Sequence, residues 1–105
     1  MSAPLVDATE AARRFRAGEA ILLDVREAFE LARASVQGAL HIPMREIPAR
    51  LPELPRGKPI LVLCHSGARS QRVADWLLPQ GYDAANVAGG IDAWADEVDA
   101  SVPKY

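Results

Sequence analysis

Cys64 is the only cysteine of the 105-residue chain, and it stands where a wholly apolar run, Ile60–Leu63, gives way to a polar loop. A helical pattern begins within a few residues, so free N–H groups and the positive end of a helix dipole would face the sulfur. Such surroundings stabilise a thiolate and bind anions. A lone cysteine is often just a small buried apolar residue, but this position favours a nucleophile in a pocket for a small anion.

The loop after the cysteine consists of His65, Ser66, Gly67, Ala68 and Arg69. Gly67 permits backbone conformations that other residues resist, and a loop whose N–H groups all point at one sulfur needs that freedom. Ser66 and Ala68 are expected to act mainly through their backbone N–H groups. His65 has two open interpretations: its ring either lowers the thiolate pKa or contacts substrate, or it faces solvent.

Two arginines, Arg69 and Arg72, fall in or beside the first turn of the predicted helix. An exposed cation there opposes the dipole at a cost of roughly 0.3–1 kcal/mol, and departures from local rules often mark functional sites. We therefore expect Arg69 to bind an anionic substrate rather than to be a solvated surface residue. Arg72 is left open between these two roles. Ser70 is expected to support the site through its backbone or its hydroxyl.

Strand and helix patterns alternate along the chain. Strands are predicted at residues 5–6, 20–25, 39–42, 60–63 and 86–88, and helices after Asp7, over 27–32, from Pro48, after the Cys64 loop and from Ile91. The run 60–63 is apolar at every position, as central parallel strands are. This alternation indicates one α/β domain over residues 1–105, with a parallel sheet and helices on both faces. Ligands bind outside the carboxyl ends of such strands, which is where Cys64 stands.

Polar and aromatic residues outside the loop have predicted structural roles. Asp24 and Arg26 end the second strand, near the rim of the pocket. We expect them to form a pair that ties loops together, and at most to support the site. His41 is expected to bond loop backbone, and Trp94 to lie in the core beneath the last helix.

Two further segments are predicted from their apolar residues alone. Over residues 27–32, helical spacing places Ala28, Leu31 and Ala32 on the inward face. Residues 102–105 follow the last helix without a pattern of their own, and we expect them to form a frayed tail.

Composition argues against several classes of protein. Half of the residues are hydrophobic, enough for one core, and the net charge of −2 gives no sign of a nucleic-acid or membrane surface. One cysteine and two histidines argue against a disulfide framework and against a metal site. The sequence shows neither a signal peptide nor an apolar run of ~20 residues. The expectation is a soluble cytoplasmic protein that uses no metal or other cofactor.

Four segments resemble the signatures of single-domain rhodaneses, a family of sulfurtransferases. Residues 22–27 (LLDVRE) are similar to the first signature, 38–43 (GALHIP) to the second, 64–70 (CHSGARS) to the active-site loop, and Gly89-Gly90 with Trp94 to the C-terminal signature. Each is weak alone, but four in this order cover nearly the whole chain. One departure is the Ala-Ser-Val at 34–36, where the family commonly has Gly-His-Ile; that run concerns the fold more than the chemistry.

The resemblance implies a three-layer α/β/α fold with a central five-stranded parallel sheet, and it implies a mechanism. Cys64 would attack the outer sulfur of thiosulfate, or of a similar donor, and release sulfite. The resulting persulfide would pass its sulfur to cyanide, a thiol or a protein acceptor. Backbone N–H groups from His65 to Arg69 would stabilise the anionic sulfur, and Arg69 would orient the incoming oxyanion.

Two alternative functions remain open. Cysteine phosphatases and some arsenate reductases resemble this architecture, but five residues separate their cysteine and arginine, whereas four separate Cys64 and Arg69. A tighter loop suits a sulfane sulfur better than a tetrahedral phosphate, and no second cysteine is present as a resolving thiol. A non-catalytic protein-interaction module of the same family typically lacks the cysteine, so Cys64 in an intact loop disfavours that alternative.

Overall fold

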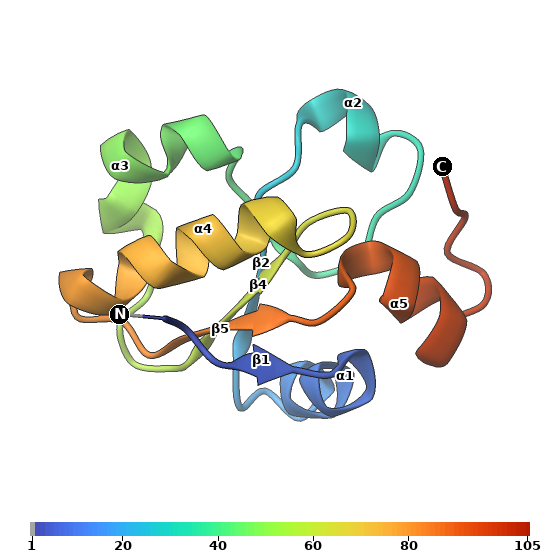
Figure 1. The fold of residues 1–105 in the computed structure, drawn as a ribbon, viewed down its shortest axis with the longest axis horizontal. Helices are drawn as coiled ribbons and strands as arrows, with labels where there is room; N and C mark the ends of the chain where they lie inside the picture. The colour runs from blue at the N-terminus through green and yellow to red at the C-terminus, as the bar shows by residue number, and fades with distance from the viewer. Residues whose placement is uncertain (1) are drawn as a thin grey trace.

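The structure is a computed structural model that describes residues 2–105, and its strands form one parallel five-stranded sheet (Figure 1). The strands are β1 (Leu5–Val6), β2 (Ile21–Asp24), β3 (Leu40–His41), β4 (Ile60–Leu63) and β5 (Ala84–Val87), in the order β1-β5-β4-β2-β3. The central strand is β4, paired with β2 and β5. The predicted five-stranded α/β fold is confirmed, although β5 begins two residues earlier than Asn86.

The helices are α1 (Ala8–Arg16), α2 (Ala28–Leu31), α3 (Ile47–Arg50), α4 (Ala68–Leu77) and α5 (Gly90–Glu97). The side chain of Asp7 accepts a hydrogen bond from the N–H of Glu10 at 2.8 Å and so caps α1, a role that aspartate commonly has just before a helix. Short 3₁₀ turns at Met44–Glu46 and Leu51–Glu53 flank α3. Pro52 lacks an N–H donor, so the chain cannot continue as regular α-helix past this point.

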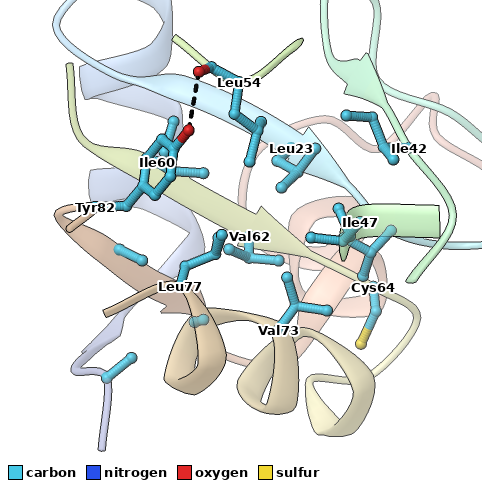
Figure 2. Close-up of a cluster of buried hydrophobic side chains, with 14 residues drawn as sticks. Leu23, Ile42, Ile47, Leu54, Ile60, Val62, Cys64, Val73, Leu77 and Tyr82 are labelled. Carbon is cyan, nitrogen blue, oxygen red and sulfur yellow. Dashed lines mark hydrogen bonds between the residues drawn. The ribbon is translucent and has the colours of Figure 1, made fainter. Parts of the chain in front are cut away.

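Apolar side chains fill both faces of the sheet, because successive residues of a strand point to opposite sides. Leu23, Ile60 and Val62 pack with residues of α3 and α4, including Ile47, Val73 and Leu77 (Figure 2). On the other face Leu22, Leu61 and Leu63 pack with α1 and α5, where Trp94 is 1% exposed. The continuous apolar run of β4 is thus explained by two covered faces, and Trp94 lies in the core as predicted.

The inward face of α2 was predicted wrongly. Ala28 and Ala32 are exposed and Leu31 is half-buried, whereas Glu30 is only 6% exposed. The prediction assumed that α2 covers apolar sheet, but its buried side meets charged and polar groups near the ends of the strands. Periodicity of apolar residues therefore gave the wrong face.

The prediction of a frayed tail was also wrong. Val102 is 8% exposed and packs in the same apolar cluster as Trp94. The ring of Tyr105 stacks on that of His65, with 4.1 Å between centroids and 13° between planes. Figure 1 shows the chain after α5 running back toward α2.

None of the helices in residues 2–105 combines the length and apolar character that a membrane span requires.

Candidate active site

Cys64 follows the last residue of β4, and α4 begins at Ala68, so the loop between them wraps the sulfur. Cys64 is 1% exposed, and Figure 2 shows its sulfur directed toward the loop and the start of α4. Its Sγ accepts hydrogen bonds from the N–H of Gly67 and from the hydroxyl of Ser70, both at 3.1 Å. Gly67 has a φ of +114°, which favours glycine, and this conformation turns its N–H toward the sulfur.

Two opposing effects act on the pKa of Cys64. Burial raises the pKa, because an anionic sulfur loses hydration. Hydrogen bonds from the side chain and backbone of Ser70, and from the backbone of Gly67 and Ser66, lower it. The net result is a lowered pKa, so the loop is built to hold a thiolate rather than only to pack a small apolar side chain.

Arg69 forms a bidentate ion pair with Glu30 of α2, with Nη1–Oε1 and Nη2–Oε2 distances of 2.7 and 2.8 Å. The carboxylate offsets the unfavourable position of a cation in the first turn of α4. The hydrogen bond from Arg69 lowers the pKa of Glu30, burial raises it, and the hydroxyl of Tyr105 lowers it further, to about 2 in all. The pair therefore persists throughout the neutral pH range.

The guanidinium of Arg69 is not wholly consumed by this pair. Its side chain is 32% exposed and borders a hollow of about 270 Å³ that is also lined by Val25, Glu27, Met44 and Arg45. Cys64 does not line this hollow, and both Nη atoms of Arg69 already bond to Glu30, so an anion at Arg69 has to bind beside that carboxylate. Binding of substrate by Arg69 stays a prediction, with Glu30 as a competitor that the sequence did not reveal.

His65 is tied to the elements around the loop. Besides stacking on Tyr105, its Nε2 lies 3.2 Å from Oδ1 of Asp92 on α5. Its side chain is 31% exposed, so the ring is neither buried nor freely solvated. Within residues 2–105, no group of three or more His, Cys, Asp and Glu side chains is arranged to hold a metal ion.

The predicted Asp24–Arg26 pair is confirmed as a structural feature. Both residues are buried, and Arg26 Nη2 lies 2.7 Å from Asp24 Oδ2. Arg26 also donates to the carbonyl of Ala34 and the hydroxyl of Tyr105. His41 Nε2 lies 2.6 Å from the carbonyl oxygen of Arg26, as expected of a residue that bonds loop backbone.

Arg72 is exposed and lines a small apolar groove with Met44 and Trp76, so its role stays open.

Asn86 was not among the predicted site residues. It is 3% exposed, and its Oδ1 accepts a 2.6 Å hydrogen bond from the hydroxyl of Ser70. A signal was present: Asn86 is the one polar residue of the strand Ala84–Val87, and buried polar groups need partners.

The N-terminus of α5 packs directly against the Cys64 loop. Ile91 N–H donates to the carbonyl of Cys64 at 2.8 Å, and Asp92 N–H to that of His65 at 3.2 Å. Gly90 has a φ of +61°, and a Cβ there would lie 2.4 Å from the oxygen of His65 and 2.5 Å from that of Cys64. This explains why the tight turn needs glycine.

Gly90→Ala is therefore expected to displace the Cys64 loop and to lower the free energy of unfolding by about 2–4 kcal/mol. Urea unfolding measures this loss. Gly18→Ala is the matched control, because Gly18 also has a positive φ but has no atom within 4 Å of the added Cβ. The control should cost only the backbone strain of about 1–2 kcal/mol. Equal losses in the two variants would contradict the close approach at Gly90.

Comparison with known proteins agrees with this arrangement. Residues 7–97 match the family model of the rhodanese-like domain. A sulfurtransferase of Allochromatium vinosum is 40% identical over 78 residues, which cover 73% of each chain. A rhodanese-related protein of Thermoplasma volcanium superposes with a TM-score of 0.84 at 30% identity, over 90% of this chain and 93% of that one. A human single-domain sulfurtransferase superposes with a TM-score of 0.80 at 27% identity, over 90% of this chain and 97% of that one. The chain belongs to the rhodanese-like domain family.

Proposed function

We propose that the protein is a sulfurtransferase that carries a sulfane sulfur as a persulfide on Cys64. The observation that carries the proposal is the sulfur itself: buried, at the end of the central strand, and held by Gly67 N–H and the Ser70 hydroxyl so that its pKa is lowered. The sulfurtransferases among its relatives support the same chemistry.

In the proposed first step the Cys64 thiolate attacks the outer sulfur of thiosulfate. The S–S bond of thiosulfate breaks, its electron pair leaves with sulfite, and a new S–S bond forms on Cys64. In the second step cyanide or a thiol attacks the terminal sulfur, and the electron pair of the Cys64 S–S bond returns to the thiolate. The backbone N–H groups of the loop stabilise the anionic sulfur in both steps.

Intact mass before and after incubation with thiosulfate tests this proposal. We expect a gain of one sulfur atom, followed by its loss and the release of thiocyanate when cyanide is added. Because Cys64 is the only cysteine, a persulfide can form only on Cys64. No gain from thiosulfate, together with faster hydrolysis of an aryl phosphate, would favour the phosphatase alternative instead.

Arg69→Ala is expected to lower kcat/KM for thiosulfate by about one to two decades, because a charge-assisted hydrogen bond to the anion is lost. Initial rates at varied thiosulfate concentration measure the effect. The substitution also leaves Glu30 buried beside the hydroxyl of Tyr105 without its cation, so some stability is lost as well.

Two controls separate binding from folding. Glu30→Gln combined with Arg69→Ala removes both charges and leaves no unpaired carboxylate, so it should recover stability but not thiosulfate use. Arg13→Ala removes an exposed arginine that pairs with Glu10 on α1, far along the chain from the loop, and should leave the kinetics unchanged. If the Arg69→Ala enzyme kept the wild-type kcat/KM, Arg69 would have no part in binding the donor.

A further inference from the structure

Ser70 stands between Cys64 and Asn86, and both neighbours compete for its hydroxyl. Its Oγ lies 3.1 Å from Cys64 Sγ and 2.6 Å from Asn86 Oδ1. A serine hydroxyl carries one proton, so it donates to the sulfur or to the amide oxygen but not to both at once. Ser70 is 0% exposed and Asn86 is 3% exposed, so the two protein acceptors compete for the hydroxyl proton with little access from solvent.

The orientation of the Asn86 amide is fixed from its other end. Its Nδ2 donates to the carbonyl of Gly67 at 3.0 Å and to Oε1 of Gln71 at 2.9 Å. Both partners are acceptors in this arrangement, so the NH₂ group of Asn86 faces them and its oxygen faces Ser70. The carbonyl of Gly67 alone would impose this orientation, because a backbone carbonyl cannot donate.

Gln71 continues the same polarity away from the site. Its Nε2 donates to the carbonyl of Ala3 at 3.0 Å and to Oδ1 of Asp75 at 2.9 Å. Neither of these oxygens can donate: a carbonyl carries no proton, and the hydrogen bonds from the N–H of Ala3 and from Gln71 lower the pKa of Asp75, so its carboxylate is ionised near neutral pH. Gln71 and Asn86 therefore each point an amide oxygen toward the next residue on the way to Cys64, and Asn86 Oδ1 is the acceptor that faces Ser70.

This polarity has a consequence for each state of the sulfur. With a neutral thiol, the S–H donates to Ser70 Oγ and the hydroxyl donates to Asn86. When the proton leaves the thiol, the hydroxyl must turn to the thiolate, and Asn86 Oδ1 loses its donor. In the persulfide, Sγ is bonded to two atoms and carries no charge, so the hydroxyl returns to Asn86.

We propose that Asn86 is a positioning residue that competes with Cys64 for the single proton of Ser70 and thereby limits how readily the thiol is deprotonated. Asn86 acts through Ser70 and does not touch the sulfur. In return, the buried hydroxyl has a partner in every state of the cycle. The inference rests on the proposed function in one respect, that Cys64 is the reacting group.

The ionisable groups near the loop have partners other than Asn86 and Ser70. They are paired as follows: Arg69 with Glu30, His65 with Asp92, and Arg26 with Asp24. None of them donates to Asn86 or to the Ser70 hydroxyl among the hydrogen bonds of residues 2–105. None of the three pairs includes Asn86 or Ser70.

The test is a double-mutant cycle read through the pH dependence of alkylation of Cys64 by iodoacetamide. The four proteins are the wild type, Asn86→Ala, Ser70→Ala and the double variant. At a fixed pH below the pKa, Asn86→Ala should raise the thiolate fraction by about three- to tenfold, the equivalent of one neutral hydrogen bond. In the S70A background the same substitution should change that fraction by less than about twofold.

A merely structural role for Asn86, holding the carbonyl of Gly67, would change the thiolate fraction by the same factor in both backgrounds, and that result would overturn the proposal. If Asn86→Ala does not fold, Asn86→Leu keeps nearly the same size and removes the acceptor. It should raise the thiolate fraction more in the wild-type than in the S70A background, and equal increases would overturn the proposal as well.

Ser35→Ala is the control for removing a hydroxyl, since Ser35 is exposed and lies in the segment after α2. Its alkylation profile should match that of the wild type. Alkylation needs no sulfur donor, so the result stands apart from the mass measurement that tests sulfur transfer. A failed mass test with a positive cycle would reject the transferase and keep Asn86 as the residue that tunes Cys64.

Discussion

Cys64→Ser is expected to abolish both the gain of a sulfur atom from thiosulfate and the turnover of thiosulfate with cyanide. A serine hydroxyl is not ionised near neutral pH and forms no S–S bond, so the loop loses the group that carries the sulfur. No other cysteine is present to take over. Intact mass and thiocyanate release, measured on both proteins at one pH, give the two readouts.

The same variant should keep its fold. The introduced hydroxyl is smaller than the thiol and can still bond to the Gly67 N–H and the Ser70 hydroxyl, so we expect less than about 2 kcal/mol to be lost on unfolding. Thermal unfolding in parallel checks this point. Normal turnover in the serine variant would show that the proposed mechanism is wrong, whatever the stability.

The pH profile of the wild type follows from the lowered pKa of Cys64. Attack requires the thiolate, and the thiolate fraction rises as pH increases through the pKa of the folded protein. We therefore expect kcat/KM for thiosulfate to reach its plateau at a lower pH than an ordinary thiol would allow. Rates measured from about pH 5 to 9 test this. A plateau only above the pKa of an unperturbed thiol would contradict it.

The strand, loop and helix around Cys64 could be predicted because their signals are local. These signals are the apolar run of β4, the glycine of the loop and the helical spacing that follows, all within residues 60–77. Together they predict that Cys64 lies at the end of a strand. The pair of Asp24 and Arg26 could also be predicted, because the two residues are only two positions apart at the end of a strand and their side chains can reach each other.

The partners that complete the site could not be predicted, because they are distant in sequence. Glu30 meets Arg69 across 39 residues and Tyr105 across 75. Apolar spacing assumes that a helix buries apolar side chains, and it fails for α2 because α2 buries the carboxylate of Glu30 against Arg69 and the hydroxyl of Tyr105. Asn86 was overlooked for a related reason: a single polar residue in a strand shows that a partner exists but not which one.

Arg26→Ala is the substitution expected to destabilise the fold most. Arg26 is 0% exposed, and its side chain pairs with Asp24, which is 1% exposed. It also donates to the carbonyl of Ala34 at 2.8 Å and the hydroxyl of Tyr105 at 2.9 Å, so it joins β2 to the segment after α2 and to the end of the chain. Truncation leaves a buried carboxylate without its cation and a carbonyl without its donor. Such a loss costs about 3–5 kcal/mol, out of the roughly 5–15 kcal/mol that stabilises a domain.

Urea unfolding of matched variants shows whether the cost arises from the unpaired charge. Asp24→Asn combined with Arg26→Met removes both charges while keeping most of the volume, and it should recover part of the stability that Arg26→Ala loses. Arg13→Ala, which breaks an exposed pair on α1, should leave the unfolding midpoint almost unchanged. If Arg26→Ala cost no more than Arg13→Ala, the buried pair of Asp24 and Arg26 would not contribute to stability as expected. Because Glu30, the partner of Arg69, stands on α2, loss of Arg26 should also weaken the use of thiosulfate in the fraction that stays folded.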